Sequence, residues 1–213
     1  MSNITTSVTE VDRDVKRRPF SGGEGHGVVL RRAYDPSVED LWDACTTPAR
    51  MEQWFLPVSG DLRPGGTYQF EGNAGGEILE CEQPHLVRAT WVYGEGPPNE
   101  VVLRLSQASD DRATLELEHV GPVEGAAVPE FVLGVGPGWD MALAALGMHL
   151  HDGKVTDKSW WEESPEAHEL IERSVRAWAA VLDEREIASP SVIAKAAYAS
   201  IAFYTGSEPS PES

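Results

Sequence analysis

The sequence predicts an α+β domain in which one curved antiparallel sheet is covered by a long helix near the C-terminus. Three observations lead to this prediction. Residues 67–119 contain several short runs in which apolar and polar side chains alternate, as strands do when one face of a sheet is buried. Residues 136–152, GPGWDMALAALGMHLHD, are almost free of charge and have apolar side chains at helical spacing. Two more segments of helical period follow, at 166–185 and 189–206.

Composition limits the class of protein and its partners. The chain has 213 residues, 41% of them hydrophobic, and seven tryptophans, which is enough for a packed core. Its formal charge of −18 repels phosphate groups, so neither nucleic acid nor an anionic membrane is an expected partner. An acidic surface more often keeps a protein soluble than indicates a particular partner. Residues 136–152 are too short and too interrupted by glycine, aspartate and histidine to be expected to span a membrane.

The two cysteines and the N-terminus predict a cytoplasmic protein. Cys45 and Cys81 have no CxxC spacing, so we expect two reduced thiols and no metal site. The N-terminal segment has no apolar stretch behind its charges and is therefore not a secretory signal. Residues 1–25 are polar and charged and run into SGGEGHG (21–27), which predicts a disordered arm.

The first elements after the arm are a strand and two short helices. Residues 28–34 have strand composition, and Asp35-Pro36-Ser37 ends the run. Ser37 and Asp40 resemble a capping box, which predicts a helix over 37–47. Pro48 predicts the start of a second short helix, PARMEQWF.

The period then changes to two. Tyr68 and Phe70 share one face of a short strand, and residues 76–94 predict two strands joined at Gln83-Pro84-His85. Residues 100–121 predict a hairpin whose apolar face carries Leu103, Leu105, Leu115, Leu117 and His119.

The long helix carries two apolar stripes. Trp139, Leu143, Leu146 and Leu150 form one stripe, whereas Met141, Ala145 and Met148 lie on the opposite side. The helix should therefore be packed on both sides, by the sheet and by another layer. Because Pro137 cannot donate a backbone hydrogen bond, we expect the helix to begin only at Gly138, and we interpret GNAGG and GVGPG as turns.

The last two helices supply the second layer. We expect residues 153–205 to form a helical extension packed on the domain, with Val192, Ala196, Ala199 and Phe203 on one face of the last helix. Alternatively, these helices exchange between two chains in a homodimer. Residues 206–213 predict a disordered tail.

Four segments in this order carry a resemblance to a known family. YDPSVEDLWDACTTPARMEQWF, GDLRPGGTYQFEG, GEILECEQPHLVRATW and GWDMALAALGMHL resemble the START-like (SRPBCC) superfamily, and within it the homologues of the activator of heat-shock-protein-90 ATPase. The resemblance covers about residues 27–152, and we expect one such domain over 26–152. It implies a helix-grip fold, in which the sheet grips the helix around an apolar cavity. Relatives bind lipids, hormones or polyketides, catalyse cyclisation or hydrolysis, or act as co-chaperones in the stress response.

The predicted faces indicate which side chains would line such a cavity. The set lies between helix and sheet, and its members are expected either to bind a ligand or to fill the core: Trp54, Tyr68, Phe70, Trp91, Leu103, Leu117, His119, Trp139, Leu143 and Leu146.

No catalytic group is predicted. His119 could act as a base, but it is better interpreted as a core or rim histidine bonded to backbone, and Tyr68 is treated in the same way. Asp140 is expected to have a structural role in the first turn of the helix. His149 and His151 point too far apart to share a metal.

The sequence therefore favours binding of a small, apolar or aromatic molecule, without a cofactor and without assigned catalysis. One alternative is an enzyme resembling a polyketide cyclase or hydrolase, which would need two ionisable side chains converging in the cavity. The other is a co-chaperone-like interaction module, which would have a filled core and an exposed apolar patch.

Overall fold

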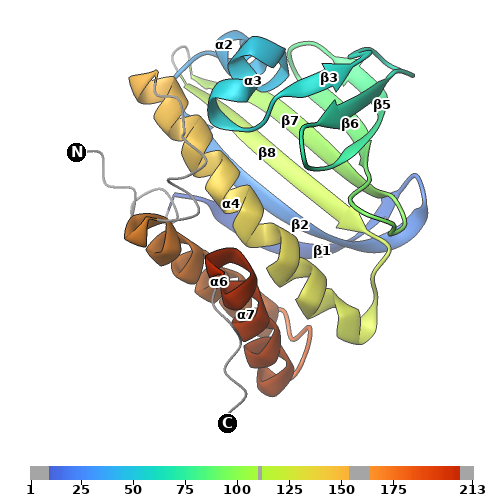
Figure 1. Cartoon of the computed structure of the whole chain (residues 1–213), viewed down its shortest axis with the longest axis vertical. Coiled ribbons are helices and arrows are strands. Elements are labelled where there is room, and N and C mark those ends of the chain that lie inside the picture. The colour runs from blue at the N-terminus through green and yellow to red at the C-terminus, as the bar shows by residue number, and fades with distance from the viewer. Residues whose placement is uncertain (1–9, 110–111, 154–163, 207–213) are drawn as a thin grey trace.

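A computed structural model describes residues 10–109, 112–153 and 164–206 of the chain. The core of the fold is one eight-stranded antiparallel sheet, in which the strands lie in the order β1-β2-β8-β7-β6-β5-β4-β3 (Figure 1). The strands are β1 (Asp12–Phe20), β2 (Gly23–Tyr34), β3 (Val58–Gly60), β4 (Thr67–Phe70), β5 (Gly75–Glu82), β6 (Leu86–Trp91), β7 (Asn99–Ser109) and β8 (Arg112–Gly121). The predicted strands of the middle of the chain are all present.

The strand β1 corrects the expectation of a disordered arm. Residues 12–20 pair with β2, with Val15 opposite Val28, whereas residues 1–9 lie outside the described part of the chain. The charges of this segment predicted exposure to solvent, but several find partners distant in sequence. Asp14, for example, forms an ion pair with Arg185 at 2.9 Å.

Two short helices follow β2 and cover one end of the sheet. Helix α2 (Val38–Thr46) begins after Ser37, whose hydroxyl accepts a hydrogen bond from the backbone N–H of Asp40, as its capping pattern predicts. Helix α3 (Pro48–Trp54) has proline in its first turn.

The long helix α4 (Val128–Asp152) begins ten residues earlier than predicted, so Pro137 lies inside it and GVGPG is not a turn. A proline near the start, Pro129, is the signal that sequence reasoning missed. The segment Gly125–His151 is long and apolar enough to cross a membrane by length and composition, which corrects our expectation that it is too short. However, 56% of its most apolar window is buried inside the protein, as in a core helix.

Side chains from the C-terminal helices compensate for the proline. Pro137 has no N–H for the carbonyl of Leu133, and the Ser200 hydroxyl donates to that carbonyl at 2.6 Å. The Tyr204 hydroxyl donates to the next carbonyl, that of Gly134, at 2.6 Å. A Cβ on Gly136 would lie 2.6 Å from the Trp178 ring, so glycine is required there for close packing.

Helices α6 (Pro165–Glu184) and α7 (Pro190–Thr205) pack on the side of α4 that faces away from the strands (Figure 1). On α6 one face is buried, with residues at helical spacing: Ala167, Leu170, Ile171, Ser174, Val175, Trp178 and Leu182. On α7 the prediction was wrong by one position, because Ile193, Ala196 and Ser200 are buried while Val192 and Phe203 are exposed. The position of Ser200 is explained by its hydrogen bond to α4.

A buried carboxylate, that of Asp140 on α4, joins three elements. Arg13 of β1 donates to both of its oxygens, with Nη2 at 2.9 Å from Oδ1 and Nε at 3.0 Å from Oδ2. On α6, the Ser174 hydroxyl and the Trp178 indole N–H donate to Oδ2 at 2.5 and 3.0 Å. The structural role predicted for Asp140 is therefore that of a tertiary link rather than a partner of the helix dipole.

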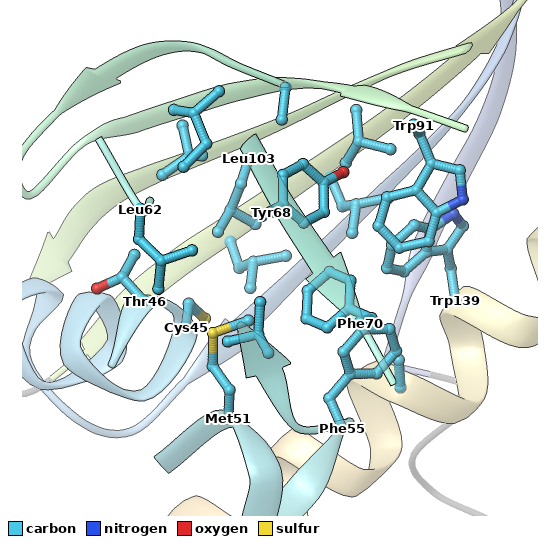
Figure 2. A pocket seen from close by; sticks show the side chains of 18 of the residues that line it. Cys45, Thr46, Met51, Phe55, Leu62, Tyr68, Phe70, Trp91, Leu103 and Trp139 are labelled. Carbon is cyan, nitrogen blue, oxygen red and sulfur yellow. The ribbon is translucent and has the colours of Figure 1, made fainter. Parts of the chain in front are cut away.

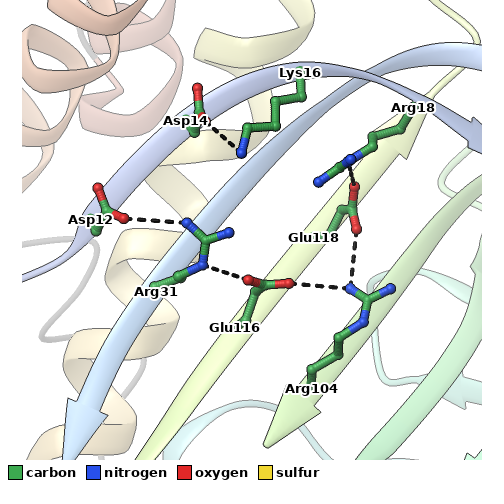
Figure 3. Close-up of polar contacts among 8 residues, drawn as sticks. All are labelled: Asp12, Asp14, Lys16, Arg18, Arg31, Arg104, Glu116 and Glu118. Atoms are coloured by element: carbon green, nitrogen blue, oxygen red, sulfur yellow. Dashed lines mark hydrogen bonds and ion pairs between the residues drawn. The ribbon is translucent and has the colours of Figure 1, made fainter.

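The face of the sheet opposite α4 is covered by ion pairs (Figure 3). Glu116 lies 2.5 Å from Arg31 and 3.3 Å from Arg104, and Glu118 lies 3.1 Å from Arg104 and 2.7 Å from Arg18. Opposite charges alternate along neighbouring strands, as cross-strand pairs favour. This polar face leaves the other face of the sheet to form the core.

We predict that Asp140→Asn lowers the free energy of unfolding by about 3–5 kcal/mol, because the buried Arg13 guanidinium would lose the carboxylate that accepts two of its hydrogen bonds. Urea denaturation followed by tryptophan fluorescence measures this loss. Glu169→Gln is the matched control: it breaks the exposed ion pair with Arg173 and should cost less than about 0.5 kcal/mol. Equal effects of the two substitutions would contradict the assigned role.

Candidate functional site

A cavity of about 180 Å³ lies between the sheet, α3 and α4. Figure 2 shows Cys45, Thr46, Met51 and Leu62 at one end of it and a group of aromatic rings at the other. Its wall comes from both short helices, from strands β3 to β8 and from α4. Of the described residues that line it, none is Asp, Glu, Lys or Arg. The cavity is therefore suited to an uncharged, apolar occupant.

The structure brings eight of the ten predicted residues to this cavity. They come from α3, four strands and α4: Trp54, Tyr68, Phe70, Trp91, Leu103, Leu117, Trp139 and Leu143. Leu146 does not line it, because one turn further along α4 the side chain is fully buried in the main core. His119 is buried behind Trp139 and does not line this cavity either.

Sequence reasoning missed other lining residues. Phe55 ends α3, and Met51 precedes it by one helical turn. Phe55 could have been identified from its position next to Trp54 at the end of a short helix, and Met51 from its helical spacing to Phe55. Leu62, Ile78 and Val101 had no distinctive pattern and are found only from the structure.

Three polar groups of the lining bond to backbone carbonyls. Tyr68 donates its hydroxyl proton to the carbonyl of Thr90 at 2.7 Å, and Thr46 donates to the carbonyl of Trp42 at 2.8 Å. The indole N–H of Trp54 donates to the carbonyl of Ala44 at 3.0 Å. These groups position the wall and leave its apolar surfaces toward the cavity.

The ionisable groups of the lining stay neutral near pH 7. Burial raises the pKa of the Cys45 thiol to about 12 and also raises the pKa of Cys81 and of the Tyr68 hydroxyl. Each shift disfavours the anion that a nucleophile or base would need. Within the described residues, no group of three or more His, Cys, Asp or Glu is placed to hold a metal.

A wall of aromatic rings closes one end of the cavity. Trp139 lies 5.1 Å from Trp91 and 6.1 Å from Phe55 between ring centroids, and Phe70 packs edge-on against Phe55 at 5.0 Å (Figure 2). Such offset and edge contacts are the arrangements that aromatic pairs prefer.

His119 fixes this wall from behind. Trp139 Nε1–H donates to His119 Nδ1 at 2.9 Å, so Nδ1 carries no proton. The neutral ring then holds its proton on Nε2, which lies 3.0 Å from the side-chain amide nitrogen of Asn99. Because two donors cannot face each other, the Asn99 amide must be rotated by 180° so that its oxygen accepts. Burial lowers the pKa of His119 to about 3, which keeps the ring neutral.

The model of the family described as Activator of Hsp90 ATPase homolog 1-like protein matches residues 35–151, more than half of the chain. The chain belongs to this family. The START-like resemblance expected from the sequence is confirmed, and so is the helix-grip fold.

Three solved structures are similar to this Activator of Hsp90 ATPase homolog 1-like chain. The crystal structure of CalU16 from Micromonospora echinospora is 38% identical, with a TM-score of 0.70, over 81% of this chain and 98% of that one. The solution structure of CalU16 is 37% identical, with a TM-score of 0.72, over 82% and 96%. DynU16, a putative protein in the dynemicin biosynthetic locus, is 24% identical, with a TM-score of 0.52, over 61% and 48%. A comparison with curated proteins gave no match.

We predict a proton-linked loss of stability for the buried histidine. The pKa of His119 is lower in the folded state, about 3, than its ordinary value of 6.5. Between these values the unfolded chain binds the proton and the folded chain does not, so stability is present above pH 6.5 and falls as the pH drops toward 3. The slope due to this group approaches about 1.4 kcal/mol per pH unit.

His119→Gln tests this prediction, because an amide can still accept from Trp139 but does not titrate. Urea denaturation at pH values from 4.5 to 7.5 should give a shallower fall for the variant than for the wild type. The carboxylates titrate in both proteins and cancel in the comparison. Parallel profiles would show that His119 is not held neutral.

Proposed function

We propose that this protein binds a small, uncharged, largely apolar molecule in the cavity between α4 and the sheet. The observation that carries the proposal is that the aromatic side chains of the lining leave about 180 Å³ open, although protein interiors are ordinarily close-packed. A dry cavity of about 150 Å³ is enough to hold benzene, so the cavity suits a molecule of one or two rings. The eight predicted residues at its wall supply contact surface, and burial of apolar area drives binding.

The two other functions considered from the sequence have less support. A cyclase-like enzyme would need converging ionisable groups, but the pKa values of Cys45, Cys81 and Tyr68 are all raised, which keeps these groups neutral, and His119 already bonds Trp139 and Asn99. A co-chaperone-like module would have a filled core, whereas the cavity is open. Ligand binding therefore ranks first.

We also propose a cytoplasmic location. Both thiols are free: Cys45 is buried and Cys81 is exposed, and an exposed unpaired thiol is typical of a reducing compartment.

We predict that Ala142→Leu weakens binding of Prodan, a neutral naphthalene dye whose emission shifts to the blue in apolar surroundings. Ala142 lines the cavity from α4, and the larger side chain would occupy space that the naphthalene needs. The Kd should rise about tenfold, which corresponds to about 1.4 kcal/mol. Fluorescence titration measures it.

The matched control for this experiment is Ala194→Leu, the same substitution at an exposed position of α7. It should bind Prodan as the wild type does. Thermal denaturation of both variants checks that they fold. Unchanged binding by a folded Ala142→Leu protein would show that the dye, if it binds, uses another site, and the proposed function would lose its support.

We propose further that two copies of the chain associate through the outward face of α7. Val192 and Tyr198 are 39% and 49% exposed on the outward side of α7, where they flank Lys195, the only charged residue of the helix. Apolar surface of this kind is typical of interaction sites. We predict that light scattering after size exclusion gives a dimer mass for the wild type and a monomer mass for Tyr198→Glu, which would bury a charge. A monomeric wild type would contradict this proposal.

A further inference from the structure

A second cavity of about 390 Å³ lies on the other side of the aromatic wall. It is lined by residues of the first half of α4, by the segment after β6 and by the end of α7. Tyr93 and Phe203 are 64% and 73% exposed at its edge, so it is open to solvent. Phe203 and Tyr204 lie outside the residues 35–151 that match the family model, which means that the C-terminal extension helps to build this cavity.

The two cavities share one wall. Phe55, Trp91 and Trp139 line both of them, so each of these rings presents one side to each cavity. Trp139 is held by its hydrogen bond to His119. Phe55 has a ring without polar atoms and sits at the C-terminal end of α3, where the helix is already ending. Rotation of the Phe55 side chain is therefore a movement that could join the two spaces without breaking a side-chain hydrogen bond.

The two cavities differ in the number of polar side chains that line them, but both lack charged side chains among the described residues. The second cavity is lined by amide and hydroxyl side chains, those of Asn73, Asn99, Tyr93 and Tyr204, and by the neutral imidazole of His119, whereas the first cavity has few polar groups. As in the first, none of the described residues that line it is Asp, Glu, Lys or Arg. A ligand with a carboxylate or phosphate would find no counter-ion in either space, and burying such a charge is costly.

We propose that the two cavities are the two halves of one binding site for an elongated, uncharged molecule. Its ring or chain portion occupies the cavity between α4 and the sheet, and a portion with hydrogen-bonding groups extends past Phe55 into the second cavity. This inference rests on the proposed function, since it requires that the first cavity binds a ligand. It adds the length of the ligand, its lack of charge and the participation of α7.

Gly134 offers a way to fill the second cavity selectively. It lines that cavity and not the first, and a Cβ at this position would have no heavy atom within 4 Å. Gly134 is exposed and lies inside α4, where residues other than glycine are better helix formers. Gly134→Phe would therefore attach its side chain without a clash at Cβ and direct a ring toward the second cavity, and Gly134→Ala is the control for the change in helix propensity.

Two dyes with the same fluorophore test the proposal on the full-length protein. Prodan carries a propionyl group on its aminonaphthalene, whereas Laurdan carries a twelve-carbon acyl chain on the same ring system. Each buried methylene strengthens binding roughly fourfold, so blocking the path of two or more methylenes should weaken Laurdan binding by about tenfold or more. We expect this loss for Gly134→Phe, with Prodan affected less than about twofold and Gly134→Ala unchanged for both dyes.

The results separate this inference from the proposed function. Ala142→Leu should weaken both dyes, because both place a ring in the first cavity. If Ala142→Leu weakens both dyes but Gly134→Phe leaves Laurdan unchanged, the proposed function stands and the two-part site is overturned. If Gly134→Phe weakens Prodan as much as Laurdan, the ring itself occupies the second cavity and the proposed arrangement is also overturned. If the wild type binds neither dye, both proposals fail together.

Discussion

The carboxylate of Asp140 is the constraint on which much of the remaining structure depends. It lies on α4 and accepts four hydrogen bonds, two from Arg13 of β1 and one each from Ser174 and Trp178 of α6. A buried charge is tolerated only when its oxygens are satisfied in this way. The cluster therefore requires that the first strand, the long helix and the extension are all in place at once. The cluster also fixes the orientation of α4 about its own axis, because Asp140 must face α6 while its neighbour Trp139 faces the cavity.

Pro137 imposes a second constraint on the same helix. It leaves the carbonyl of Leu133 without an intrahelical donor, and Ser200 supplies one from α7. Next to Pro137, Trp178 packs so closely against Gly136 that no Cβ fits between them. The extension is thus bound to α4 by hydrogen bonds that α4 itself leaves open. This interdependence explains how α7 comes to lie beside the aromatic wall and to line the second cavity.

The two sides of the cavity differ in how firmly they are held: the α4 side is fixed by hydrogen bonds, whereas the α3 side has few buried contacts. Trp139 is held through His119 and Asn99, a chain of side-chain hydrogen bonds that extends from α4 to β8 and β7. On the opposite side, α3 is one of the shortest helices, none of its residues is buried, and it ends at Phe55. Segments with few buried contacts open at lower free energy than the core does. Access to the cavity is therefore expected from the α3 side rather than from α4.

The amino-acid sequence predicted the alternation of the strands, the capped start of α2, the two apolar stripes of α4 and eight of the residues at the cavity wall. These features are local, because period and capping depend on residues a few positions apart. It did not determine that Asp12–Phe20 is a strand, that α4 continues through Pro137 or which face of α7 is buried. Each of these depends on partners more than sixty residues away: Asp140 for Arg13, and Leu133 for Ser200. The position of His119 behind the wall and the second cavity beside the first are visible only in the folded protein, because both arise where separate elements pack together.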